Sequence, residues 1–230
     1  MTDFPGFSPA FFAFFRELAA HNDRDWFNAN KDRYKAEVVA PLSSFIEAMA
    51  PRLGAISAHF VADPRPNGGS MFRIYKDVRF SKDKRPYKEH GAVQFRHAAG
   101  KDAHAPGYYV HLAPDEIFFG GGIWLPPSPQ LKAIREAIAK PDGGWDKVIG
   151  DRDFAKTFGG VHGDGLSRPP RDFDKDHPHI EDLKRKSFFG MRREAPDFAL
   201  RPDFVEAVGA TFRAATPLMR FLTRAVGQPF

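Results

Sequence analysis

The segment RIYKDVRFSKDKRPYKEH, residues 73–90, concentrates side chains of the kind that bind phosphate or carboxylate groups. Seven basic and three acidic side chains give this segment a net charge of +4. If such a cluster is catalytic, the chemistry it offers is electrostatic stabilisation of developing negative charge. The structural alternative is a strand end followed by a solvated loop that arginine–aspartate pairs hold in place.

A strand over residues 71–80 would sort this charge onto one face. Alternation gives an apolar face made of Phe72, Ile74, Val78 and Phe80. Lys76 is the one exception on this face. The opposite face would carry Met71, Arg73, Tyr75, Asp77 and Arg79. There the Asp77 carboxylate would fix the orientation of the neighbouring guanidinium groups. A helix is the alternative, because helical spacing also fits, but it would leave Phe72 and Phe80 in solvent.

The loop SKDKRPYK, residues 81–88, would extend this anion site. Pro86 restrains the residue before it, and Tyr87 offers an aromatic ring with a hydroxyl group. The ligand-binding candidates of the whole segment are Arg73, Asp77, Arg79, Ser81, Lys82, Lys84, Tyr87 and Lys88. Ser81 and Lys84 also match the S-x-x-K nucleophile pattern of some acyl-transfer enzymes, but the accompanying motifs of that chemistry are missing from the sequence.

Two further segments could contribute to the same site. KRKSFFGMRR, residues 184–193, has five basic side chains and no acid, and Lys184 and Lys186 are its candidates. FFGGGIWLP, residues 118–126, could bring the backbone N–H groups of Gly121 and Gly122 close to a phosphate. A bulge or turn at the end of a strand is the structural alternative for these glycines. The whole chain carries +5, so the residues outside the two basic segments are net acidic, which favours an anionic partner.

The segment NDRDWFNANKDRY, residues 22–34, supplies secondary candidates. Arg24, Trp26 and Lys31 could extend the anion site, although an ordinary amphipathic helix is the alternative. Histidines and carboxylates also gather in DFDKDHPHIED, residues 172–182. The spacing there fits no metal-binding helix, so we predict a solvated loop and no metal site. No motif indicates a particular cofactor.

Helices are expected at both ends of the chain, with strands grouped between them. Helical periodicity covers about the first 55 residues, and further helices are expected at 128–140 and from Pro202 onward. Alternating segments predict strands over 92–97, 107–112 and 116–121. A hairpin at Pro114-Asp115 is expected to join the last two. Residues 141–180 are expected to form loops with short helical turns, before a helix that runs into a strand or loop near 188. This order predicts an α+β fold, a central mostly antiparallel sheet flanked by N- and C-terminal helices.

Composition excludes several classes of protein. The sequence has no cysteine, which excludes disulfides, thiolate metal sites and cysteine nucleophiles and fits a cytoplasmic location. No apolar run approaches the roughly 18 residues that a membrane span needs, so no membrane partner is expected. The 24 phenylalanines predict an aromatic-rich core, and we expect residues 1–230 to form a single domain.

Four segments together resemble the family catalogued as domain of unknown function 2461. They follow one another along nearly the whole chain: LAAHNDRDWFNANKDRY (18–34), RIYKDVRFSKDKRPYK (73–88), FGGGIWLP (119–126) and LSRPPRDFDKDHPHIEDLKRKSF (166–188). Lys76 stands where the family often has arginine, which keeps the charge. The resemblance implies a single domain in which these segments matter together, and it implies no particular reaction.

The residues favour one function and leave two others open. The favoured interpretation is an uncharacterised protein whose basic pocket binds a small anionic ligand, one that bears phosphate or carboxylate, with or without catalysis. Basic and aromatic residues alternate in 184–193, as in nucleic-acid patches, so a nucleic-acid-associated module is the alternative. A scaffold for a protein partner, without chemistry, is the third possibility.

Overall fold

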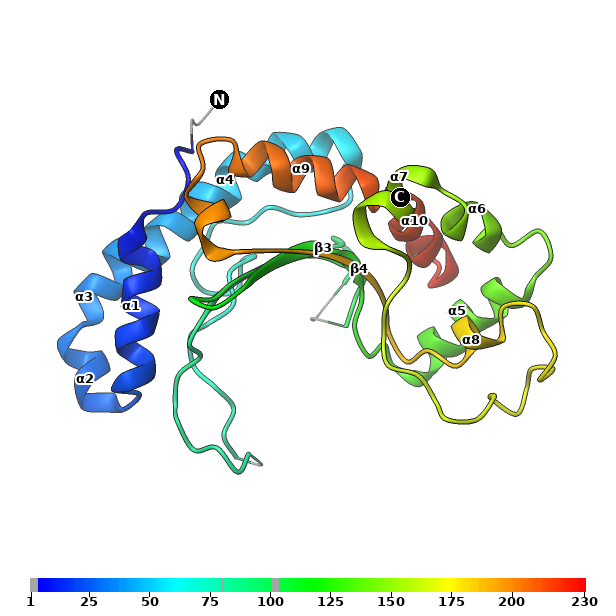
Figure 1. Cartoon of the computed structure of the whole chain (residues 1–230), viewed down its shortest axis with the longest axis horizontal. Coiled ribbons are helices and arrows are strands. Elements are labelled where there is room, and N and C mark those ends of the chain that lie inside the picture. Colours follow the sequence, from blue (N-terminus) through cyan, green and yellow to red (C-terminus); the bar gives the residue numbers. More distant parts are fainter. Residues whose placement is uncertain (1–3, 80, 101–103) are drawn as a thin grey trace.

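The structure, a computed structural model, describes residues 4–79, 81–100 and 104–230. In this part of the chain a four-stranded sheet lies between helices from both ends of the sequence (Figure 1). Its strands are β1 (Gly91–Arg96), β2 (Gly107–Leu112), β3 (Ile117–Ile123) and β4 (Phe188–Glu194). They are adjacent in chain order, and each neighbouring pair is antiparallel. The predicted α+β fold with an antiparallel sheet is therefore confirmed, as is the hairpin between β2 and β3.

The N-terminal helices are α1 (Pro9–Ala20), α2 (Arg24–Ala29), α3 (Lys31–Tyr34) and α4 (Ala40–Ile56). The Asp23 side chain caps α2 by accepting from the backbone N–H of Trp26. A π-helical turn, Lys35–Val39, joins α3 to α4 just before Pro41. Proline has no N–H to donate, so the wider turn lets the helix continue through this position.

The C-terminal half contributes the remaining helices. They are α5 (Ser128–Ala139), α6 (Trp145–Ile149), α7 (Arg152–Phe158), α8 (Ile180–Leu183), a 3-10 turn (Pro196–Leu200), α9 (Phe204–Ala214) and α10 (Thr216–Ala225). The predicted helix at 128–140 is confirmed, and so is the passage from a helix into a strand near residue 188. The predicted last helix is two helices, because Pro217 starts a new first turn after Ala215. Among the described residues, no helix is long and apolar enough to cross a bilayer.

One face of the sheet carries the core. Helix α4 packs on β1, α9 and α10 pack on β3, and α7 packs on β4. Phenylalanines dominate the largest fully buried side chains, as the composition predicted. Phe45 of α4 lies among rings from the N-terminal segment, β1 and α9, and so connects three parts of the fold.

The prediction of a strand over 71–80 is wrong, and the helical alternative is not observed either. Residues 70–79 and 81–90 form an irregular hairpin, here called the arm, which extends from the sheet edge beside β1 (Figure 1). Among these described residues, pairing is limited to isolated bridges, Met71 with Val93 and Tyr75 with Tyr87. Pro86 cannot donate to a ladder and basic side chains occupy both halves of the hairpin, so a regular strand is disfavoured.

The predicted alternation of exposure is nevertheless partly kept in the arm. Ile74 is buried, and the charged or polar side chains of the opposite side are exposed, namely Arg73, Tyr75, Asp77 and Arg79. Met71, predicted on that exposed side, is buried instead because it pairs with Val93 on the core face. Phe80 lies outside the described residues.

Asn22 ties the arm to the N-terminal helices. Its side-chain amide donates to the Tyr87 carbonyl oxygen at 3.1 Å and to the Glu89 carboxylate at 2.7 Å, while its oxygen accepts from the Tyr87 N–H at 3.1 Å. The Tyr87 ring stacks on Phe27 with centroids 4.2 Å apart. One asparagine and one aromatic stack therefore hold the arm against the N-terminal helices.

Asn22→Ala is expected to loosen the arm and to lower the free energy of unfolding by about 1–3 kcal/mol, because three hydrogen bonds are lost. Amide hydrogen exchange should accelerate at Tyr87, whose N–H loses its acceptor, and at Lys88, whose N–H donates to Ile74. The matched control is Asn28→Ala, at an exposed position of α2. Unchanged exchange at both amides would contradict this role of Asn22.

Candidate functional site

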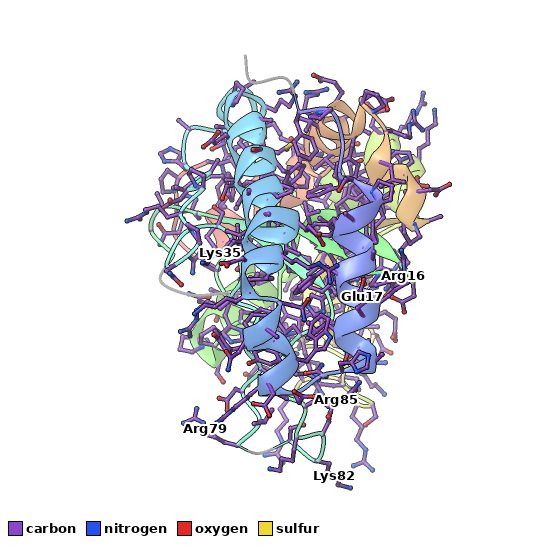
Figure 2. The ribbon with its side chains drawn as sticks, turned by 90° about the vertical axis from the view of Figure 1, so that its left-hand side faces the viewer. Arg16, Glu17, Lys35, Arg79, Lys82 and Arg85 are labelled. Carbon is purple, nitrogen blue, oxygen red and sulfur yellow. The ribbon has the colours of Figure 1, made fainter. Side chains whose placement is uncertain are left out.

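Several charges at the far end of the arm pair with one another. Arg79 binds Asp77 at 2.7 Å and lowers the pKa of that carboxyl to about 2. Asp83 accepts from both Arg85 and Lys76 at 2.9 Å. Asp77 thus orients one guanidinium as predicted, although it forms no ion pair with Arg73 within the described residues. Figure 2 shows Arg79, Lys82 and Arg85 at the end of the arm, below the helices. This part fits the structural alternative, a solvated loop braced by ion pairs.

Ser81 and Lys84 belong to the same braced loop. The Ser81 hydroxyl accepts from the Asp83 backbone N–H at 3.1 Å, and the Lys84 ammonium donates to the Val78 carbonyl oxygen at 3.0 Å. Each group therefore supports a local turn. The S-x-x-K match does not bring a lysine amine to a serine hydroxyl in any contact of the described residues.

Three predicted ligand-binding residues do not have the positions that this role requires: Tyr87, Gly121 and Gly122. Tyr87 is only 3% exposed, so its ring is part of the core and not a platform for a ligand. The two glycines lie inside β3, not at its end. A Cβ at Gly121 would lie 2.9 Å from the Met219 sulfur, and one at Gly122 would lie 2.3 Å from the Phe188 carbonyl oxygen. Their lack of a side chain lets α10 and β4 pack closely against β3.

The remaining candidates are divided between the two ends of the molecule. Lys184 pairs with Glu181 at 2.6 Å and, like Lys186, lies between α8 and β4, at the end of the sheet away from the arm (Figure 1). The structure therefore does not bring them to the arm. Among the secondary candidates, Trp26 packs on Phe14, whereas Arg24 and Lys31 are exposed on the helices beside the arm.

The face of the sheet opposite the core, here called the open face, is the feature that the sequence did not reveal. Among the described residues, no helix lies across it in Figure 1. Register places side chains from all four strands on it: Gln94, Arg96, Tyr109, His111, Phe118, Phe189, Met191 and Arg193. All of these are half-buried except Arg193, which is exposed.

Aromatic rings connect the arm to the far side of the open face. Phe72 of the arm lies 6.0 Å from Tyr109, measured between ring centroids, and Tyr109 lies 5.8 Å from Phe118. Cations lie over the two ends of this series. The Lys88 ammonium is 5.3 Å from the centre of the Phe72 ring, and the Arg193 guanidinium is 4.9 Å from that of Phe118.

Two histidines meet between these ends. His90, just before β1, and His111 of β2 have ring centroids 4.1 Å apart, and His111 stacks on Phe118 at 4.4 Å. The Tyr109 hydroxyl lies 3.2 Å from Nδ1 of His111. Lys88, His90 and His111 are called the Lys–His cluster below. None of the three forms an ion pair with a described carboxylate.

Burial and like charges disfavour protonation of the cluster. The pKa of His90 is lowered to about 4 by burial and by the charges of His111, Lys88 and Lys76, with Asp115 opposing. Burial also lowers the pKa of His111, against the opposing charges of Glu116 and Asp115. The pKa of Lys88 is lowered by burial and by Arg73, and burial raises that of Tyr109 to about 12. Both imidazoles are consequently neutral at neutral pH.

The chemistry that this arrangement offers is hydrogen-bond donation to an anion. A negative group beside the Lys–His cluster would accept hydrogen bonds from the Lys88 ammonium and from imidazoles that become protonated. In the described part of the chain, no set of three or more histidine, aspartate or glutamate side chains could hold a metal ion. Of the residues predicted from the sequence, Lys88 belongs to the cluster and Arg73 lies near it. The sequence did not single out His90, Tyr109 or His111 as site residues.

Comparison with known proteins gives a family but no characterised relative. The family model described as "Conserved hypothetical protein (DUF2461)" matches residues 10–221, which include the arm, the sheet and the Lys–His cluster. No curated protein and no solved structure matches the chain significantly.

Proposed function

Because the chain belongs to the DUF2461 family of conserved hypothetical proteins, whose description names no activity, we propose a function from its geometry. The protein binds a small anionic ligand, bearing a phosphate or carboxylate group, at the Lys–His cluster. One observation carries the proposal: Lys88, His90 and His111 gather on the open face without a paired carboxylate. Asp115 and Glu116 act on the histidines without forming an ion pair with them, so the ligand would supply the directly paired negative charge that the cluster lacks.

The aromatic rings of the open face also indicate the chemistry of the part of the ligand that is attached to the anionic group. Tyr109 and Phe118 lie next to His111, so a flat apolar group attached to the anion could pack on their rings. The Lys88 ammonium already donates to the Arg73 carbonyl oxygen at 2.9 Å, which holds it at the edge of this surface. A small organic anion would therefore contact more of the site than an inorganic ion does.

Sulfate, which stays dianionic over the relevant pH range, is a probe whose own charge does not change. We expect its affinity to rise as the pH falls from 6.5 toward about 4, since sulfate favours the protonated form of His90. Each proton taken up on binding strengthens binding by at most about tenfold per pH unit. Isothermal titration calorimetry over this range measures the slope, and His90→Gln should flatten it. A pH-independent affinity, or no binding at low ionic strength, would overturn the proposal.

Without sulfate, the free energy of unfolding should fall as the pH falls, whereas the affinity for sulfate should rise. Above pH 6.5 the His90 imidazole is neutral in the folded and the unfolded chain, so it contributes no pH dependence. Below pH 6.5 the unfolded chain takes up the proton first, so the free energy of unfolding falls until the folded protein is protonated near pH 4. Sulfate should reduce this loss, as thermal unfolding with and without the ion would show.

Single-stranded nucleic acid is the second candidate ligand, because exposed rings on an antiparallel sheet can stack bases. The series Phe72, Tyr109 and Phe118, with a cation at each end, is the observation that favours it. The two candidates separate with Phe118→Ala, which should weaken oligonucleotide binding much more than sulfate binding. Absence of oligonucleotide binding at low salt excludes this second candidate.

A further inference from the structure

We infer that the protein has a second anion site, independent of the Lys–His cluster, in a cleft between helices α5, α6, α7, α9 and α10. This cleft takes a ligand that carries several phosphate groups. It lies on the core side of the sheet, since Arg192, whose guanidinium is over the buried Phe119 ring, contributes to its lining. The open face is on the other side, so the two sites share no residue.

The cleft is large enough for an organic ligand. Its volume is about 1690 Å³, above the range of roughly 300–1,000 Å³ that is usual for small-molecule sites. Its walls keep this space because several positions on α5 and α9 are alanine, namely Ala133, Ala137, Ala210 and Ala214. The hydroxyl of the buried Tyr108 lies beside Thr216 and Arg220, two of the residues that line the cleft.

Positive charge exceeds negative charge along this lining. Five of its cations form neither an ion pair nor a cation–π contact with any described residue: Lys140, Lys147, Lys156, Arg213 and Arg224. Arg220 also lacks an ion pair, but its guanidinium lies over the Phe230 ring. Two of the carboxylates that line the cleft are already engaged, because Glu136 pairs with Lys132 and Asp151 caps α7. The unengaged acids are Asp142 and Asp153, so the unpaired cations outnumber them.

The distribution of these cations indicates several anionic groups in the ligand. The five come from the ends or sides of α5, α6, α7, α9 and α10, so they surround the cleft and do not cluster at one point. A concave surface lined by one sign of charge raises the local potential for counter-ions. A single phosphate could reach only part of this ring of cations, whereas a chain of phosphates could bridge it.

Inorganic tripolyphosphate is the probe, with orthophosphate for comparison, and calorimetry at low ionic strength is the measurement. We expect tripolyphosphate to bind more tightly than orthophosphate. The double variant Arg213→Ala/Arg224→Ala should weaken it by about tenfold or more, because two charge-assisted contacts are lost. Both side chains are exposed, so the variant should keep the wild-type circular dichroism spectrum.

The matched control removes the same charge elsewhere. Arg16→Ala/Lys82→Ala takes two exposed cations from α1 and the arm (Figure 2) and should change the affinity less than about threefold. In a Lys88→Met background, Arg213→Ala/Arg224→Ala should cause the same loss of tripolyphosphate affinity, so a failure of the Lys–His cluster as a site does not affect this result. Equal losses in the two double variants, or no binding of tripolyphosphate by the wild type, overturn the inference.

Discussion

Phe45→Ala is expected to lower the free energy of unfolding by about 3–5 kcal/mol, the largest loss of stability that we predict for a single substitution. The Phe45 ring is fully buried, with centroid distances of 5.6 Å to Phe4, 5.7 Å to Phe7 and 5.6 Å to Phe204. It also lies 6.4 Å from Phe95 of β1. Truncation would leave a cavity where the N-terminal segment, the sheet and α9 meet, and close-packed rings relax only partly into such a space.

Urea unfolding followed by circular dichroism measures this loss. The control is Glu47→Ala, an exposed position on the same helix, which should stay within about 0.5 kcal/mol of the wild type. A loss below about 1 kcal/mol for Phe45→Ala would mean that the aromatic cluster repacks, contrary to its predicted role.

Lys88→Met/His90→Gln is expected to weaken sulfate binding by about a hundredfold at mildly acidic pH, since each charge-assisted hydrogen bond contributes about 1.5–3 kcal/mol. In the proposed site, Lys88 would contribute a charge, and His90 would contribute a proton that it takes up when the anion binds. Methionine keeps most of the apolar stem of lysine, so the loss reports charge more than packing.

The control for this variant lies on the same arm. Lys82→Met removes one exposed cation from the far end, and it should leave the sulfate affinity within about twofold of the wild type. If Lys82→Met weakens binding as much as the cluster variant does, sulfate responds to the general charge of the arm and the Lys–His cluster is not a site.

The sequence predicted the fold where local patterns decide it. Alternation in GYYVHL and the Pro114-Asp115 turn gave the β2–β3 hairpin, and proline or capping residues marked most helix starts. The conformation of the arm was not predicted, because it depends on residues that are distant in the sequence. Asn22, 65 positions from Tyr87, holds it, and the buried Phe27 receives the Tyr87 ring. That residues 1–230 form a single domain stays a prediction.

The candidate site was found only in part, for a related reason. High charge density pointed to the arm, but most of those charges pair within it, as Arg79 does with Asp77. His90 and His111 meet through the register of β1 and β2, which alternation within one strand does not specify. The available signal was that Tyr109 and His111 alternate onto one face of a hairpin strand.

The most direct test of the proposed function follows the histidine ring resonances by NMR while sulfate is added near pH 6. We expect saturable shifts of the His90 and His111 rings and a rise in the pKa of His90 from about 4, because the bound anion stabilises the imidazolium. Half-buried His59 and His179, remote in sequence from the cluster, should not move. Shifts confined to the amides of residues 81–85, with the His90 pKa unchanged, would contradict the proposed function.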